Sequence, residues 1–156
     1  MQDNGGRLKP VNTLTSEYLR KIFGKDNYKG KSATEVILGM MYNPVSWSME
    51  PIIKASHPRI RIFLSSEDMD SKYIRASFND FFDANGDYLL AKDVGISYEK
   101  LPKDRDQFDK DLIKVDERVN ICFAVYAGGI FRFFPLPDDS TNSWVTHTQS
   151  TNFTGN

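Results

Sequence analysis

The chain has 156 residues, of which 40% are hydrophobic and 13% aromatic, and its formal net charge at pH 7 is −1. A chain of this length buries about two-thirds of the surface that it exposes when unfolded, which is enough for one domain. The near-neutral charge excludes a general attraction to nucleic acid. Since the chain has a single cysteine, an intrachain disulfide, a CxxC redox pair and a cysteine-based zinc site are also excluded.

The two ends of the chain are polar. No stretch approaches the roughly 18–20 apolar residues that cross a bilayer, and the first residues lack the apolar core of a signal peptide. Polar residues 1–10 and the hydroxyl-rich end would suit a soluble piece cut from a larger chain. We expect one soluble domain over residues 1–145, followed by a polar tail over residues 146–156.

Residues 1–31 carry seven basic side chains against three acidic ones. This local excess is explained either by a solvated basic face or by a docking patch for an anionic partner or a membrane surface. The sequence alone leaves both readings open.

The first predicted helix carries an apolar face that runs from Leu14 to Phe23. Thr13 or Thr15 would cap its start, and Gly24 would end it. These residues favour one amphipathic helix near the N-terminus.

A second helix is predicted to begin at Ser32, because Ser32 and Glu35 have the spacing of a capping box. It would end at Tyr42, just before an Asn-Pro pair. The segment 51–64 is ambiguous, since its isoleucines suit either short strands or two short helices broken at Pro58.

The middle of the chain predicts a short aromatic helix and then a helical hairpin. Ser77 would cap the aromatic helix, whose phenylalanines are expected in the core. The hairpin covers about residues 88–127, with a first helix over 88–100 and a long second helix over 104–126. The apolar residues of the long helix recur every three or four positions: Phe108, Leu112, Val115, Val119, Cys122 and Tyr126.

The C-terminal part predicts a small β element. Residues 130–137 alternate well enough for a strand, residues 138–140 suit a turn, and residues 143–145 suit a returning strand. The predicted fold class is therefore α+β, mainly α, with a helical hairpin and a small C-terminal β element.

The sequence contains no convincing catalytic or metal-binding motif. Residues 83–87 resemble the start of an EF-hand loop, but the positions of the turn glycine and the bidentate glutamate are occupied by Tyr88 and Val94. A polar turn is the simpler interpretation. Cys122 lies on the apolar stripe, where a buried, inert thiol is expected. No catalytic residue and no metal site is predicted.

Two histidines and three aromatic residues are the candidates left for binding. His57 precedes a proline and His147 lies in the polar tail, so each is a surface or structural residue or, alternatively, a haem ligand. Phe131, Phe133 and Trp144 would pack on the helices or, alternatively, present stacking surfaces to a ligand or partner.

The N-terminal segment is harder to explain by packing alone. Residues 6–20 begin with Gly-Arg-Leu-Lys-Pro-Val-Asn-Thr and lead into the first helix. This segment resembles one in the extracytoplasmic region of bacterial cytochrome c biogenesis proteins of the CcsA/ResB type, the system II machinery of haem delivery and cytochrome c synthesis. Further segments look like this family in the same order: residues 36–41, 43–47, 77–82, 108–120, 134–137 and Trp144.

The resemblance implies a periplasmic domain of a bacterial inner-membrane protein that handles haem and attaches it to apocytochrome c. The family's tryptophan-rich haem-handling segment and its membrane-embedded histidines have no counterpart here. The resemblance therefore implies a non-catalytic accessory module without its own cofactor, in a parent protein that uses haem. Its expected partners are the membrane-embedded remainder of the same protein and apocytochrome c. Arg7, Lys9 and Pro10 would form a structural turn or a contact with these partners.

Two alternatives remain at this point. The first is a haem-binding domain that uses His57 or His147 as an axial ligand. The second is a freestanding soluble enzyme of unknown class.

Overall fold

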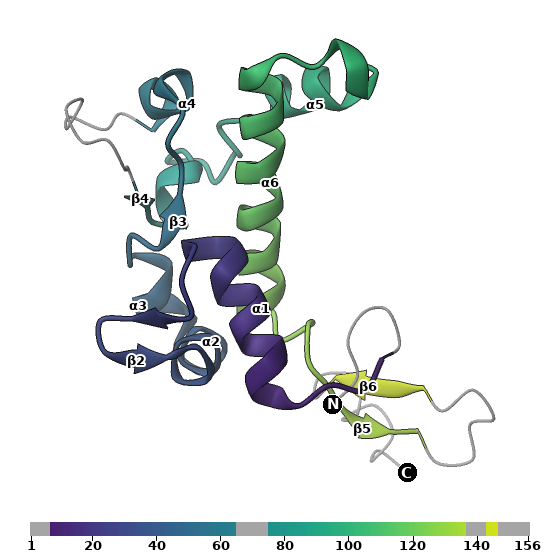
Figure 1. The fold of residues 1–156 in the computed structure, drawn as a ribbon. Coiled ribbons are helices and arrows are strands. Elements are labelled where there is room, and N and C mark those ends of the chain that lie inside the picture. Colours follow the sequence, from purple (N-terminus) through teal and green to yellow (C-terminus); the bar gives the residue numbers. More distant parts are fainter. Residues whose placement is uncertain (1–6, 65–74, 137–142, 147–156) are drawn as a thin grey trace. The chain divides into compact units, whose positions relative to one another are not determined.

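The computed structural model describes residues 7–64, 75–136 and 143–146. They form two compact units: unit 1 contains residues 7–21, 25–44 and those from 123 onward, and unit 2 contains residues 22–24 and 45–122. The fold is mainly helical with a few short strands, so the predicted α+β class is confirmed (Figure 1). The expectation of one domain over residues 1–145 stays a prediction. The tail from residue 147 lies outside the described residues.

Helix α1 (Val11–Phe23) lies mainly in unit 1 and begins earlier than the sequence predicts. The amide of Leu14 donates to the carbonyl of Pro10 at 3.2 Å, so the first helical hydrogen bond ends on Pro10. Thr15 lies inside the helix, where its hydroxyl donates back to the carbonyl of Val11 at 3.0 Å. The prediction of Thr13 or Thr15 as the cap was therefore wrong.

A tight hairpin and α2 follow in unit 1. Strands β1 (Asn27–Tyr28) and β2 (Lys31–Ser32) pair antiparallel. The two residues between them have φ of 48° and 77°, as a type I′ turn requires. Helix α2 (Ala33–Tyr42) has the predicted capping box, with Ser32 and Glu35 bonded in both directions. Its start and end are as predicted.

The C-terminal part of unit 1 begins with the last turn of α6 (Gln107–Tyr126). The amide of Gly128 donates to the carbonyl of Val125, and the amide of Gly129 donates to that of Ala124, which is a Schellman motif. Strands β5 (Arg132–Pro135) and β6 (Trp144–Thr146) then pair antiparallel, with a bulge in β5. The two predicted strands are confirmed, and the predicted turn at 138–140 lies outside the described residues.

The first part of unit 2 contains α3 (Pro44–Ser48), β3 (Ile53–Lys54), α4 (Pro58–Phe63) and β4 (Arg75–Ala76), which pairs antiparallel with β3. The ambiguous segment 51–64 thus contains both a short strand and a helix. Proline stands at the first position of α4, where its missing N–H costs no helical hydrogen bond.

The second part of unit 2 contains the short 3₁₀ helices η1 (Asn79–Phe81) and η2 (Pro102–Asp104), helix α5 (Ala91–Glu99) and most of α6. The predicted cap is present, since the Ser77 hydroxyl accepts from the amide of Asp80. Of the three phenylalanines expected in the core, Phe81 is fully buried and the other two are half-buried. Five of the six apolar residues predicted for α6 are buried: Phe108, Leu112, Val115, Val119 and Cys122.

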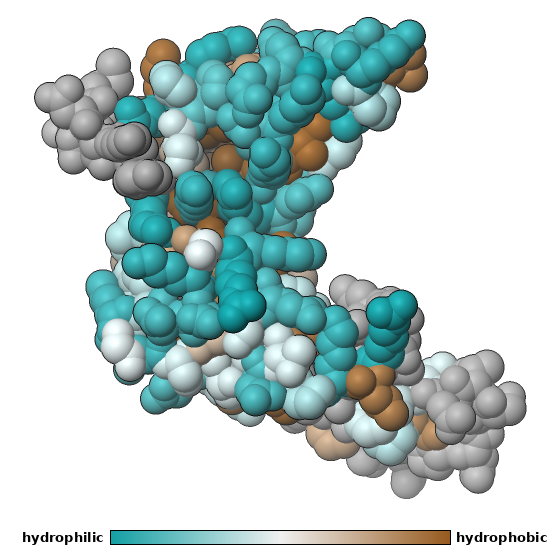
Figure 2. Space-filling view, in the orientation of Figure 1, coloured by the Kyte–Doolittle hydropathy of each residue, from teal (hydrophilic) through white to brown (hydrophobic). Residues whose placement is uncertain are grey.

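Most of the visible surface of the described residues is hydrophilic (Figure 2). The polar loop at residues 83–87 is the turn that the sequence predicts, because the carboxylate of Asp83 accepts the amides of Asn85 and Asp87. Among the described helices, none combines the length and the apolar character needed to cross a bilayer.

Candidate functional site

A pocket with a volume of about 370 Å³ lies in unit 2, between the segment that joins β3 to α4 and one face of α6. Its walls contain three basic side chains, one acidic side chain and a histidine. The full set of lining residues is Lys54, Ser56, His57, Pro58, Asp111, Lys114, Val115 and Arg118.

Helix α6 supplies one wall through helical periodicity. The lining positions 111, 114, 115 and 118 fall on one face at 3.6 residues per turn. The guanidinium group of Arg118 donates to the carbonyl oxygen of Lys54 at 2.5 Å, although the two residues are 64 positions apart. This bond ties the end of β3 to α6 and fixes the direction of the arginine side chain.

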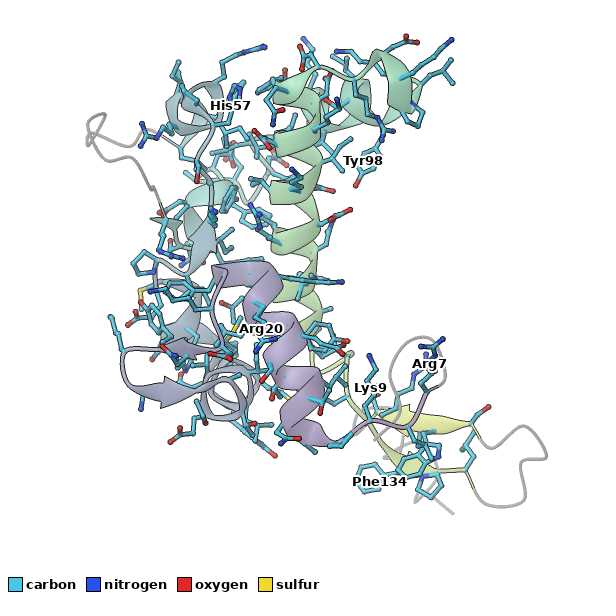
Figure 3. All side chains as sticks on the ribbon, in the orientation of Figure 1. Arg7, Lys9, Arg20, His57, Tyr98 and Phe134 are labelled. Atoms are coloured by element: carbon cyan, nitrogen blue, oxygen red, sulfur yellow. The ribbon has the colours of Figure 1, made fainter. Side chains whose placement is uncertain are left out.

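His57 lies at the start of α4, on the side that faces α6 (Figure 3). Its Nδ1 atom accepts the amide of Arg59 at 3.2 Å, which caps the helix. The ring lies edge-on to that of Phe108, with 5.2 Å between the centroids. Because Nδ1 is an acceptor, the proton of the neutral ring is on Nε2, which is a hydrogen-bond donor.

The pocket carries more positive than negative charge. Asp111 is the acidic lining residue, and its carboxylate is engaged by Lys114 at 3.5 Å and by the amide group of Gln107 at 2.9 Å. Burial lowers the pKa of Arg118, an effect that the nearby Asp111 opposes. Even so lowered, an arginine pKa lies far above neutrality, so the guanidinium group stays charged.

Ser56 adds a hydroxyl to the same wall. Its oxygen is buried and makes no hydrogen bond within the part of the chain that the structure describes. A buried hydroxyl without a partner costs free energy. The arrangement of positive charge, donors and an unused hydroxyl suits a small anion.

The N-terminal candidates lie in unit 1, far along the chain from the pocket residues. The ammonium group of Lys9 pairs with the carboxylate of Glu17 at 2.8 Å, and the carbonyl of Pro10 accepts the first bond of α1. Arg7 is exposed. The expected role of Arg7, Lys9 and Pro10, a structural turn or a contact with a partner, stays a prediction.

The described aromatic candidates, Phe131 and Trp144, belong to unit 1, whereas His57 belongs to unit 2. Phe131 is fully buried in unit 1 and meets the ring of Tyr18 at 6.4 Å, whereas Trp144 is half-buried in β6, where it pairs with Pro135 of β5. The side chain of Phe133 and the whole of His147 lie outside what the structure describes.

Sequence reasoning missed the basic pocket. His57 was a candidate, but Lys54, Lys114 and Arg118 were not named as candidates from the sequence. The 3.6-residue spacing places positions 111, 114, 115 and 118 on one helix face, but it does not show that another segment packs on that face. Among the described residues, no three His, Cys, Asp or Glu side chains form a group that could hold a metal ion.

No family model matches the chain. The chain is 39% identical over 150 residues to Protein NrfI of Wolinella succinogenes. The match covers 96% of this chain but spans only 16% of the length of NrfI. Nearly the whole chain is therefore similar to one segment of a much longer protein.

Proposed function

We propose that this chain is an interaction module of a bacterial cytochrome c synthase, placed on the periplasmic side of the inner membrane and non-catalytic by itself. The observation that carries the proposal is the 39% identity with NrfI over 96% of this chain. This likeness supports a link to cytochrome c maturation, in which haem is attached to apocytochrome. The segments that resemble system II proteins follow one another in the same order as in that family. They support the assignment to a periplasmic module of a membrane cytochrome c synthase.

The size relationship supports the role of a module. A chain that matches 16% of a longer relative corresponds to one part of that protein, and the remainder would hold the other functions. The partners of the module are the membrane-embedded remainder of the parent protein and apocytochrome c. The proposed contact is the lead-in to α1, residues 7–10. Arg7 is exposed there, and the ion pair between Lys9 and Glu17 ties this segment to α1.

The test is a replacement within NrfI. The segment of NrfI that matches this chain is exchanged for it, and haem bound covalently to a c-type apocytochrome is measured by haem staining after denaturing electrophoresis. We expect the exchanged protein to retain haem attachment and a deletion of the segment to lose it. Full attachment after the deletion would contradict the proposal.

The proposed contact is tested in the same assay with a charge reversal. Arg7→Glu in the exchanged segment should lower haem attachment, because it reverses an exposed charge at the proposed surface. Lys110→Glu is the matched control, since it reverses an exposed charge on α6 outside both the lead-in and the pocket. Equal haem attachment in the two variants would show that the lead-in is not the contact. The role of the chain as a module would then be decided by the replacement test alone.

A further inference from the structure

We propose that the pocket between the β3–α4 segment and α6 binds one carboxylate group carried on a small apolar body. The ligand class is an aliphatic or aromatic monocarboxylic acid. This inference does not depend on the role in cytochrome c maturation, because it rests only on the geometry and chemistry of unit 2.

Charge selects an anion. Lys54, Lys114 and Arg118 line the pocket against the single carboxylate of Asp111. The excess of positive charge attracts an anion. Among anions, a carboxylic acid also carries hydrocarbon, which inorganic phosphate and sulfate lack.

Two of the lining residues, Ser56 and His57, carry hydrogen-bond donors. The hydroxyl of Ser56 is buried without a partner among the described residues, and Nε2 of His57 carries the ring proton because Nδ1 accepts from Arg59. Hydrogen bonds to an ionised carboxylate are roughly twice as strong as those between neutral groups. We expect a bound carboxylate to become a hydrogen-bond partner of the Ser56 hydroxyl.

The remaining lining is apolar and the pocket is small. Pro58 and Val115 provide hydrocarbon surface beside the charged groups. The volume of about 370 Å³ stands at the lower end of the range for small-molecule sites, which is roughly 300–1,000 Å³. A compact acid with a ring or a short branched chain matches both the surface and the size.

The experiment is an isothermal titration of the full 156-residue chain with benzoate. Benzyl alcohol serves as the uncharged probe of similar shape, and inorganic phosphate serves as the anion without an apolar body. We expect saturable one-to-one binding of benzoate, and at least about tenfold weaker binding of the other two, which corresponds to about 1.4 kcal/mol. Equal binding of benzyl alcohol or of phosphate, or no binding of benzoate, would overturn the proposal.

Variants locate the binding. Lys54→Gln and Lys114→Gln should each weaken benzoate by about two- to fivefold, as expected for the loss of one partly exposed charge pair. Ser56→Ala should weaken it by a similar factor. Lys110→Gln removes an exposed charge of the same helix outside the pocket and should leave the affinity unchanged.

Folding of each variant is checked by circular dichroism. The side chain of Lys114 is 57% exposed, so Lys114→Gln is the variant that best preserves the fold and decides the result if another variant unfolds. Benzoate affinity that is the same in Lys114→Gln and Lys110→Gln would place binding elsewhere and overturn the assignment of the pocket.

Discussion

The carboxylate of Asp109 accepts hydrogen bonds from the ammonium group of Lys100 through both of its oxygens, each at 2.8 Å. The hydroxyl of Ser97 donates to the same carboxylate at 2.8 Å, and Asp109 and Asp106 cap the start of α6 through reciprocal backbone bonds. One aspartate therefore joins the end of α5 to the beginning of α6. It holds the helical hairpin that the sequence predicts.

Asp109→Asn should destabilise the chain. The side-chain amide of asparagine keeps one oxygen acceptor but carries no charge. The hydrogen bonds from Lys100 and from the backbone amide of Asp106 therefore become fewer and weaker. We expect the thermal midpoint of unfolding, measured by circular dichroism, to fall by several degrees. Asp104→Asn is the matched control in η2, where the side chain is exposed. A midpoint unchanged in Asp109→Asn would show that this cluster does not stabilise the hairpin.

Stability should decrease in acid partly through the same residue. The hydrogen bonds from Lys100 hold the pKa of Asp109 well below its usual range. A lowered carboxyl pKa gives stability that is fully present above the unfolded value of about 4 and is lost as the pH falls through the folded value. Urea unfolding between pH 6 and pH 2 should therefore show the wild type losing its advantage over Asp109→Asn. A difference in unfolding free energy between the wild type and Asp109→Asn that grew as the pH fell would contradict this argument.

Two glycine substitutions should have opposite effects. Gly128 ends α6 with φ of +67°, so Gly128→Ala should cost about 1 kcal/mol of unfolding free energy although no atom lies within 4 Å of the new Cβ. Gly95 lies inside α5 with equal space and ordinary φ, so Gly95→Ala should stabilise by about 0.5–1 kcal/mol. Chemical denaturation measures both, and effects of the same sign would contradict the conformational argument.

Local sequence signals predicted much of the secondary structure. The capping box at Ser32 and the apolar spacing of α6 act over a few residues, and both were interpreted correctly. Pro10 shows where such reasoning failed, since a backbone carbonyl rather than a threonine side chain begins α1. The hairpin turn at Lys29 and Gly30 was also missed, because lysine rarely adopts positive φ.

The pocket needed tertiary structure. Arg118 and Lys54 are 64 positions apart, and no local pattern indicates that the guanidinium of one reaches the carbonyl of the other. In the sequence, Lys114 and Asp111 belong to a charged helix face that a solvated surface explains equally well. Only the packing of the β3–α4 segment on α6 turns part of that face into a wall.

Phe131, which directly precedes β5, and Phe134, which lies in β5, should separate packing from surface roles. Phe131 is fully buried, so Phe131→Ala should cost about 3–5 kcal/mol of unfolding free energy. Phe134 is 44% exposed, so Phe134→Ala should cost about 1 kcal/mol or less. Denaturant unfolding followed by circular dichroism measures both. Similar losses of unfolding free energy in the two variants would show that burial does not determine how much Phe131 stabilises the fold.

A haemin titration of the chain, followed by the Soret band, should show no shift that depends on His57. An imidazole whose Nδ1 accepts the amide of Arg59 carries its proton on Nε2, and that proton would have to move before Nε2 could bind iron. His57→Asn retains a side-chain acceptor for the helix cap, so it removes the ligand while preserving α4, whereas His57→Ala removes both. His147→Ala tests the other candidate histidine in the same series. A saturable one-to-one shift that is lost in His57→Asn while α4 stays folded would make His57 a haem ligand and replace the role of a cofactor-free module.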